Sequence, residues 1–361
     1  MNKIDDIRTR WLRVPFPAPV ADATHVLEFL DLITVEVRSG DLYGGCYMLS
    51  FDYAPALLKG IVDHELRRRL IGTPADDIRA VFEQACGATE YIGPEGLAMW
   101  GISAIDTALW DLLARRLNVP VSVIFGRQAR AVPAYGSGGW LSYTDEQLAD
   151  EVSRHMAHGF AGVKLKIGSS SEDRDIERVK AVRQAIGPER MLMVDANQGL
   201  TLDRARRFAR RVEDCRLQWL EEPFPKRDVE SYVQLRAATE IPLAAGEREY
   251  GRAPFRRLLQ TGAIDVVQPD LLRAGGVTVW RSVAELTQAF QRRLAPHFYK
   301  EYDVHLAAAC PNLVAIECFD WLDPLLEQPL EIANGKAIVP DRPGFGVQFR
   351  AESFRDYEVT R

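Results

Sequence analysis

Short apolar runs alternate with amphipathic segments along most of the chain, from residue 162 onward. The segments between the runs have helical periodicity, as in Asp173–Ile186 and Leu202–Val212. This order is typical of parallel strands with helices outside them. With one earlier run, the expected strands are Ala131–Gly136, Gly162–Ile167, Met191–Asp195, Leu217–Glu221, Leu243–Gly246, Ile264–Gln268, Arg293–His297 and Leu313–Glu317. Strands at this interval predict a closed barrel rather than an open sheet.

The first third of the chain has a different pattern, which predicts a separate α+β domain. Two apolar runs, Ile4–Val14 and Leu27–Val37, are separated by a proline-rich segment, and Gly96–Leu117 has the apolar side of a long helix. The expected fold class is therefore α/β, a modified TIM-type barrel of the (β/α)7β kind with a capping domain. The expected parts are the capping domain at 1–130, the catalytic barrel at 131–320, and a C-terminal segment at 321–361 that packs back on the capping domain.

Composition and charge narrow the class of protein. Of the 361 residues, 47% are hydrophobic and 27% are charged, which is the usual balance of a globular protein. We find no apolar stretch near the ~18 residues that span a bilayer and no secretory signal, so we expect a cytoplasmic protein without a membrane partner. The net charge of −6 argues against nucleic acid or anionic lipid as a partner. Five scattered cysteines predict reduced thiols rather than disulfides or a zinc cluster.

Three carboxylates recur at a fixed interval at the ends of predicted strands. Asp195, Glu221 and Glu247 each close an apolar run, and 26 residues separate each from the next. Because parallel barrel strands all end at one face, these side chains are expected to meet at the barrel mouth. Buried carboxylates that meet need a hard divalent cation. We expect Mg²⁺, with Mn²⁺ as the alternative because it also accepts oxygen ligands.

Two further strand ends carry groups that could exchange a proton. Lys164 and Lys166 lie on one face of a strand, and the apolar Leu165 between them suits the helix layer. Both lysines are thus expected to point into the barrel, where burial and a nearby cation should lower their pKa. His297 ends the seventh run and Asp270 follows the sixth, so Asp270 could fix the tautomer of the imidazole.

Other polar residues near the strand ends have less certain roles. Glu317 ends the eighth run and could donate a hydrogen bond if it holds a proton. Glu222 is beside Glu221, and since successive strand residues point in opposite directions we assign only Glu221 to the metal. Asn197 could orient the metal or a substrate oxygen, or be a plain turn residue. Three histidines in helical patterns are expected on the surface: His64, His155 and His158.

Together these residues suit removal of the weakly acidic proton next to a carboxylate. The product of that step is an enediolate, which the cation, Lys164 and a protonated Glu317 would stabilise. Lysine or histidine bases combined with magnesium are the known pattern for this chemistry.

The motifs around these residues resemble those of the mandelate racemase subgroup of the enolase superfamily. They are Lys164-Leu165-Lys166, Val194-Asp195-Ala196-Asn197, Trp219-Leu220-Glu221-Glu222-Pro223, Gly246-Glu247, Pro269-Asp270, Gly275-Gly276-Val277-Thr278 and Pro296-His297-Phe298. The resemblance covers nearly the whole chain. In its C-terminal part, the chain is most similar to the acid-sugar dehydratases of that family.

The resemblance implies a role for each of these residues. It places magnesium on the three carboxylates, Lys166 as one base, Lys164 against the substrate carboxylate, the Asp270/His297 pair on the opposite side, and Glu317 as a hydrogen-bond donor. It also implies that capping-domain loops near His25 and Phe51 contact the far end of the substrate. The implied assembly is a symmetric homo-oligomer, with an octamer as one candidate.

Two enzymatic hypotheses follow from this reading. The leading one is Mg²⁺-dependent dehydration of a sugar acid or diacid (aldonate or aldarate) to a 2-keto-3-deoxy acid, which makes the enzyme a lyase. The alternative is an isomerase, a racemase or epimerase of a 2-hydroxy acid that uses the same Lys166 and His297. A third, non-enzymatic hypothesis is a sugar-acid binding or scaffold protein, which exchange of the substrate α-proton with solvent would distinguish.

Overall fold

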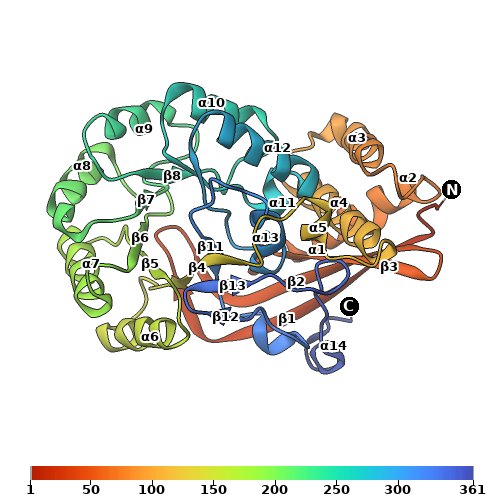
Figure 1. The fold of residues 1–361 in the computed structure, drawn as a ribbon, viewed down its shortest axis with the longest axis horizontal. Coiled ribbons are helices and arrows are strands. Elements are labelled where there is room, and N and C mark those ends of the chain that lie inside the picture. Colours follow the sequence, from red (N-terminus) through yellow and green to blue (C-terminus); the bar gives the residue numbers. More distant parts are fainter. Residues whose placement is uncertain (1, 361) are drawn as a thin grey trace.

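The computed structural model describes residues 2–360 and consists of a barrel and an N-terminal lobe beside it (Figure 1). The lobe contains an antiparallel sheet in the order β1 (Asp6–Ala21), β2 (Val26–Ser39) and β3 (Leu42–Leu49). Its helices are α1 (Pro55–Gly60), the π-helix η1 (Ile61–Leu66), α2 (Arg67–Leu70), α3 (Ile78–Thr89), the 3-10 helix η2 (Glu90–Ile92), α4 (Leu97–Arg116) and α5 (Val121–Ile124).

Helix α4 is the core helix of the lobe. It packs on β3 and β2 and also on two barrel helices, α11 (Leu271–Ala274) and α12 (Gly276–Ala289). By length and composition it is apolar enough to cross a membrane, contrary to the sequence expectation, but 78% of its apolar window is buried inside the protein. The apolar surface of α4 is therefore explained by packing between the lobe and the barrel.

Strand β1 is longer than the sequence predicts, because it continues through the proline-rich segment. Its pairing with β2 runs without interruption from Asp6 to Pro15, shifts register, and resumes at Val20. Strand β1 is at the edge of the sheet, where a proline that lacks an N–H group costs no ladder hydrogen bond. The prolines therefore bend the strand instead of ending it.

The barrel follows the strand-and-helix alternation that the sequence predicts. Its strands are β4 (Ala131–Gly138), β5 (Gly162–Lys166), β6 (Met191–Asp195), β7 (Trp219–Glu221), β8 (Leu243–Ala245), β9 (Val266–Val267), β10 (Arg293–Leu294) and β11 (Ile316–Cys318). The intervening helices are α6 (Asp145–Ala157), α7 (Glu172–Ile186), α8 (Leu202–Arg211), the 3-10 helix η3 (Glu213–Cys215), α9 (Val229–Arg236), α10 (Ala253–Thr261), α11 (Leu271–Ala274), α12 (Gly276–Ala289) and α13 (Lys300–Ala307).

Parallel pairing closes the barrel. Neighbouring strands pair in chain order from β4 to β10, and β11 pairs with β4. The remaining seam is closed next to β10, where Leu294 pairs with Leu313 and the N–H of Val314 donates to the carbonyl of Leu294 at 2.8 Å. The predicted (β/α)7β barrel with a capping domain is confirmed. Several strands are shorter than predicted, as in β7, β9 and β10.

The interior of the barrel is a small core of its own. Tyr135, Met193, Trp219, Ala244 and Val266 belong to it and are fully buried. The large side chains come from β4, β6 and β7 and the smaller ones from β8 and β9, and together they fill the interior, as in other parallel barrels. The mouth, and not the interior, is left for chemistry.

The tip of the β1–β2 hairpin reaches over the barrel mouth (Figure 1). The N–H of Leu141, which follows β4, donates to the carbonyl of Ala21 at 2.8 Å. Ala23 packs so closely on Gly168 and Gly199 that a Cβ atom there would lie 2.9 Å and 2.7 Å from it. Glycine in both barrel loops is therefore what allows the hairpin to approach.

The C-terminal segment divides its contacts between the two parts. It contains the 3-10 helix η4 (Asp323–Leu325), β12 (Ile332–Ala333), β13 (Lys336–Ile338) and α14 (Ala351–Tyr357). Strand β13 pairs with the start of β4, whereas the last residues reach β1, where the N–H of Val359 donates to Trp11 at 2.8 Å. Packing on the capping domain is thus only part of its role, and the domain limits at 130 and 320 stay predictions.

Candidate active site

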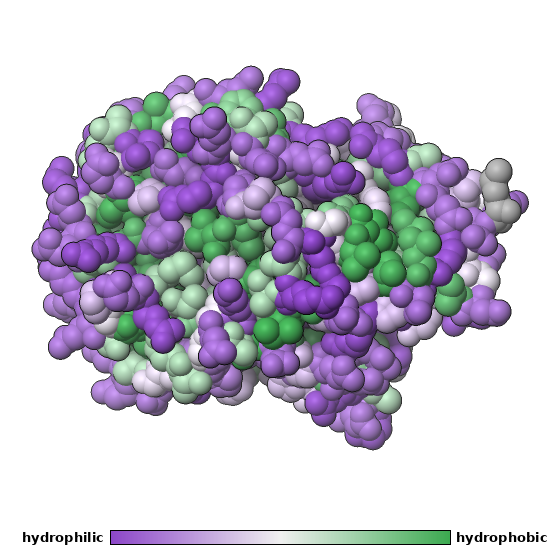
Figure 2. Space-filling view, in the orientation of Figure 1, coloured by the Kyte–Doolittle hydropathy of each residue, from purple (hydrophilic) through white to green (hydrophobic). Residues whose placement is uncertain are grey.

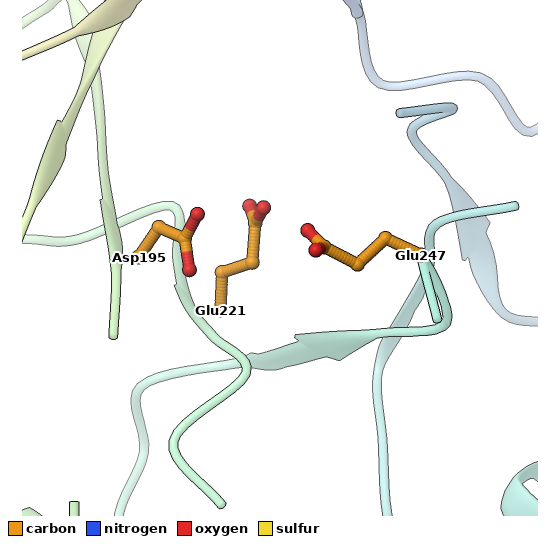
Figure 3. A group of neighbouring side chains, drawn as sticks. All are labelled: Asp195, Glu221 and Glu247. Carbon is orange, nitrogen blue, oxygen red and sulfur yellow. The ribbon is translucent and has the colours of Figure 1, made fainter. Parts of the chain in front are cut away.

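Asp195, Glu221 and Glu247 meet at the barrel mouth (Figure 3). Each contributes an oxygen atom, and these three atoms all lie within 4.8 Å of one another. Asp195 and Glu221 are paired residues at the ends of β6 and β7, and Glu247 follows β8. All three side chains are almost completely buried. The regular spacing in the sequence therefore becomes a single cluster of negative charge.

The two lysines of β5 point into this cluster. The Nζ atom of Lys164 lies 2.5 Å from Glu221 and 2.7 Å from Glu317, and that of Lys166 lies 2.6 Å from Asp195. Lys164 is fully enclosed, whereas Lys166 reaches the open space above it. The lysines thus offset part of the charge of the carboxylates.

The lysine pKa values were expected to be lowered beside a bound cation, and that lowering stays a prediction. Burial would lower the pKa of Lys164, but attraction by Glu221 and Glu317 raises it well above its usual value. Burial is likewise outweighed for Lys166, whose pKa is raised mainly by Asp195. Direct ion pairs, which favour the charged form, therefore outweigh burial for both lysines in this structure.

Glu221 and Glu222 have separate environments, as their opposite strand directions require. One Glu221 oxygen accepts hydrogen bonds from Gln268 at 2.7 Å and Trp219 at 2.8 Å, which fix the carboxylate toward the cluster. Glu222 instead accepts from Arg248 at 2.8 Å. Burial raises the pKa of Glu221 to about 7 and that of Glu222 to about 8.

His297 is held by Asp270 from the adjacent strand end. Its Nδ1 donates to Asp270 at 2.9 Å, and Asp270 in turn accepts from the N–H groups that begin α11. The other ring nitrogen, Nε2, is thereby directed at the cluster, 3.3 Å from Glu247. Burial would lower the pKa of His297, but the charge of Glu247 and the Asp270 hydrogen bond raise it to about 9.

Glu317 lies beneath the site, between Lys164 and His297. It accepts a hydrogen bond from the N–H of Phe298 at 3.0 Å. Burial would raise the pKa of Glu317, but attraction by Lys164 and His297 lowers it. The ionised form of the Glu317 carboxyl group is therefore favoured in this structure. The hydrogen-bond donor role expected for Glu317 requires that a bound substrate raise its pKa, so that the carboxyl group holds a proton.

A cavity of about 350 Å³ lies above these groups, between the barrel mouth and the capping domain. Lys166, Asn197, Glu247 and His297 line its floor. Lys164, Glu221 and Glu317 lie below the floor and support it. A space of this size suits a small molecule that reaches the metal cluster and both candidate bases.

The remaining predicted residues lie at different places. His25 and Phe51 line the cavity from the capping domain, and the buried Asn197 has an amide oxygen without a hydrogen-bond partner in the described chain. The roles of these residues stay predictions. Of the histidines expected at the surface, His64 and His158 are exposed. His155 is not, because its ring packs on Phe160 and Gly136, and burial lowers its pKa to about 4.

Sequence reasoning missed several cavity residues. Arg248 and Arg273 flank Glu247 at 3.4 Å and 3.6 Å, and Asp22 lines the cavity beside His25. Trp140 lies over Lys166, with 5.3 Å between Nζ and the ring centroid. Arg248 follows a predicted ligand directly, a signal that could have identified it. Arg273 comes from the short helix α11, and Asp22 and Trp140 come from loops, and none of them has a local pattern that marks it as a cavity residue.

The cluster fits a magnesium ion. Three carboxylates supply the hard oxygen donors that magnesium prefers, and one buried oxygen of Glu247 has no hydrogen-bond partner in the described part of the chain. Burial would raise the pKa of Glu247, yet His297, Arg248 and Arg273 lower it, which keeps the carboxylate ready to coordinate a cation.

A capped (β/α)7β barrel with three carboxylate ligands between a lysine pair and a histidine–aspartate pair defines the enolase superfamily. The chain belongs to the mandelate racemase and muconate lactonizing enzyme family, because residues 6–126 match the N-terminal domain of that family and residues 147–353 match the enolase C-terminal domain-like model. Both the predicted family and its place among acid-sugar dehydratases are supported by individual relatives.

An L-talarate/galactarate dehydratase of Salmonella typhimurium is 35% identical, with 99% of this chain and 92% of that protein covered. A 3,6-anhydro-alpha-L-galactonate cycloisomerase of Streptomyces coelicolor is 32% identical, over 95% and 96%. The crystal structure of a racemase from Streptomyces coelicolor with bound magnesium superposes with a TM-score of 0.95, 32% identity, and coverage of 99% and 100%. The magnesium bound in that crystal structure, together with the carboxylate cluster, confirms magnesium as the cofactor. The dehydratase and the cycloisomerase confirm that the chain is an enzyme, a lyase with an isomerase as the alternative.

Proposed function

We propose that the protein catalyses the magnesium-dependent dehydration of a sugar acid, an aldonate or aldarate, to a 2-keto-3-deoxy acid. The observation that carries this proposal is the convergence of Lys166 and His297 on one cavity, next to the three carboxylates. Similarity to a talarate/galactarate dehydratase over almost the full chain supports the substrate class.

Each site residue has a task in this reaction. Magnesium, held by Asp195, Glu221 and Glu247, supplies a positive charge that makes the proton next to the substrate carboxylate more acidic. Lys164 binds that carboxylate, and one of Lys166 and His297 removes the α-proton. His297 gives a proton to the departing 3-hydroxyl group, while Asp270 holds the ring in the required tautomer. Tautomerisation of the resulting enol then gives the 2-keto acid.

The alternative function uses the same two groups without elimination. If Lys166 and His297 face opposite sides of one carbon, one can remove a proton and the other return it, which gives a racemase or epimerase. A hydroxyl group on the neighbouring carbon permits dehydration, and its absence restricts the enzyme to racemisation. The substrate thus decides between the two activities.

A screen for α-proton exchange tests the proposal. The magnesium-loaded protein is incubated in D₂O with a panel of aldonates, aldarates and aryl 2-hydroxy acids, and proton NMR follows both exchange and 2-keto product. We expect exchange with 2-keto acid formation for at least one sugar acid. Exchange without 2-keto product would favour the racemase, and the absence of exchange from the whole panel would contradict both functions.

A further inference from the structure

We propose that the substrate is a monocarboxylate whose far end is uncharged, so that aldonates are substrates and aldarates are not. This proposal rests on the proposed function, because it names the substrate class of the same site. It follows from the charges and rings that line the cavity away from the metal cluster.

No described lysine or arginine of the capping domain lines the cavity. Among the described residues that line this wall, Asp22 and His25 are the groups that carry charge, and the others include Leu27, Leu49 and Leu97. His25 Nδ1 lies 3.2 Å from a carboxylate oxygen of Asp22. The pair therefore has no net positive charge to offer a second carboxylate.

Asp22 makes this wall unfavourable for an anion. Burial would raise its pKa, but the His25 hydrogen bond and the charge of Lys166 lower it to about 2, so the carboxylate stays ionised at neutral pH. A second substrate carboxylate placed here would lose its hydration and meet a like charge. A hydroxymethyl group at the same place can instead donate a hydrogen bond to Asp22.

The two arginines that line the cavity come from the barrel and already face carboxylates. Arg248 donates to Glu222 at 2.8 Å and lies 3.4 Å from Glu247. Arg273 lies 3.6 Å from Glu247 and donates to its backbone carbonyl at 3.2 Å. Their charges thus balance buried anions of the metal site, which argues against a role in binding a distant carboxylate.

Aromatic rings cover another wall of the cavity. Trp321 stacks on Phe319 with 4.4 Å between centroids and on Trp140 with 5.5 Å, and it meets Phe51 edge-on at 5.6 Å. All four residues line the cavity. Flat apolar rings pack well on the C–H face of a neutral polyol chain but do not compensate a desolvated charge.

Matched pairs of acids test the proposal directly. Each pair consists of a hexonate and the hexarate with the same configuration at carbons 2 to 5, such as gluconate with glucarate and galactonate with galactarate. Binding to the full-length, magnesium-loaded protein is measured by calorimetry, and α-proton exchange by NMR. We expect the hexonate of the best-bound pair to bind at least tenfold more tightly. Equal or tighter binding of its hexarate would overturn the proposal.

A charge placed on the capping wall provides a second test. Leu97 lines the cavity and is 40% exposed, so Leu97→Arg should fold, and Leu97→Gln is its uncharged control. Leu97→Arg should strengthen hexarate binding at least tenfold. Asp22→Asn should likewise strengthen the binding of the hexarate relative to that of the hexonate. Unchanged hexarate binding in both variants would mean that missing positive charge is not what excludes diacids, and would overturn the proposal.

The outcomes separate this inference from the function on which it rests. A preference for hexarates together with α-proton exchange would contradict the proposal of a monocarboxylate substrate but would not contradict the proposed dehydratase function. If no acid of either series binds or exchanges its α-proton, the proposed function fails and this inference fails with it.

Discussion

Lys166 and His297 face one cavity from strands that are not neighbours in the barrel, since Lys166 ends β5 and His297 follows β10. Each is held by its own carboxylate, Asp195 at 2.6 Å and Asp270 at 2.9 Å. A substrate carbon between them would meet a proton-transfer group on two sides. This relationship supports both the dehydratase and the racemase hypothesis.

Replacement of Lys166 should remove most of the activity. We expect Lys166→Ala to lower kcat by about 10²- to 10⁴-fold, the usual contribution of a general base. The loss of kcat is measured by steady-state kinetics with the substrate that the screen identifies. Lys180→Ala, at an exposed position on α7, is the matched control. Near-normal turnover by Lys166→Ala would remove the lysine from the mechanism.

The tautomer of His297 should depend on Asp270. Asp270→Asn replaces the acceptor of the Nδ1 proton with a weaker one, so we expect a loss of kcat of about 10²-fold or more, approaching that of His297→Asn. The double variant should be no worse than His297→Asn, since the two residues act as one unit. Additive losses would contradict this coupling. His64→Asn, at an exposed position, is the control.

Magnesium should stabilise the protein through the three carboxylates. A ligand at a hundredfold excess over its Kd stabilises the fold by about 2.7 kcal/mol, which appears as a higher Tm. Glu247→Gln should lose this magnesium-dependent shift, whereas Glu230→Gln, exposed on α9, should keep it. Chelation should abolish turnover by the wild type, and added magnesium should restore it. A full Tm shift in Glu247→Gln would argue against Glu247 as a ligand.

Arg178 should act as a positioning residue for Trp140. Its guanidinium is buried and donates to the carbonyls of Gly139 at 2.7 Å and Trp140 at 3.0 Å, which holds the tryptophan over Lys166. We expect Arg178→Gln to lower kcat/KM about tenfold, because misplaced groups lose orientation. Arg174→Gln, on the same helix but in an exposed ion pair, should have no effect. Equal kinetics for the two variants would contradict this role.

His305 should make the fold sensitive to acid. Burial lowers its pKa from the ordinary 6.5 to about 3, so the folded state keeps the ring neutral while the unfolded state binds a proton. This contribution to stability is present above pH 6.5 and is lost as the pH falls toward 3, by about 2 kcal/mol between pH 7.5 and 5. The free energy of unfolding, measured by urea denaturation at several pH values, should depend less on pH in His305→Gln than in the wild type. An equal dependence would contradict the prediction.

Much of the barrel could be predicted because its signal is local. A run such as Met191–Asp195 needs only its own residues to indicate a buried parallel strand, and it appears with those limits. The metal cluster was predictable for a related reason: Asp195, Glu221 and Glu247 recur once per unit, and barrel geometry then brings them together.

The remaining features depend on contacts that no local pattern contains. On the surface, hydrophobic residues gather in separate areas of a mostly hydrophilic face, one of them over the helices of the N-terminal lobe (Figure 2). Arg273 and Asp22 reach the cavity only because α11 and the hairpin tip are placed there by packing between the lobe and the barrel. The raised lysine pKa values likewise come from carboxylates on other strands.

The most direct test of the account is the position of a metal ion in a crystal soaked with Mn²⁺, whose anomalous scattering identifies it. We predict one ion at the barrel mouth, coordinated by an oxygen from each of Asp195, Glu221 and Glu247 at about 2.0–2.2 Å, with Lys166 and His297 on either side of the open positions. An ion bound elsewhere, or a cluster that stays unoccupied at saturating Mn²⁺, would contradict the proposed active site.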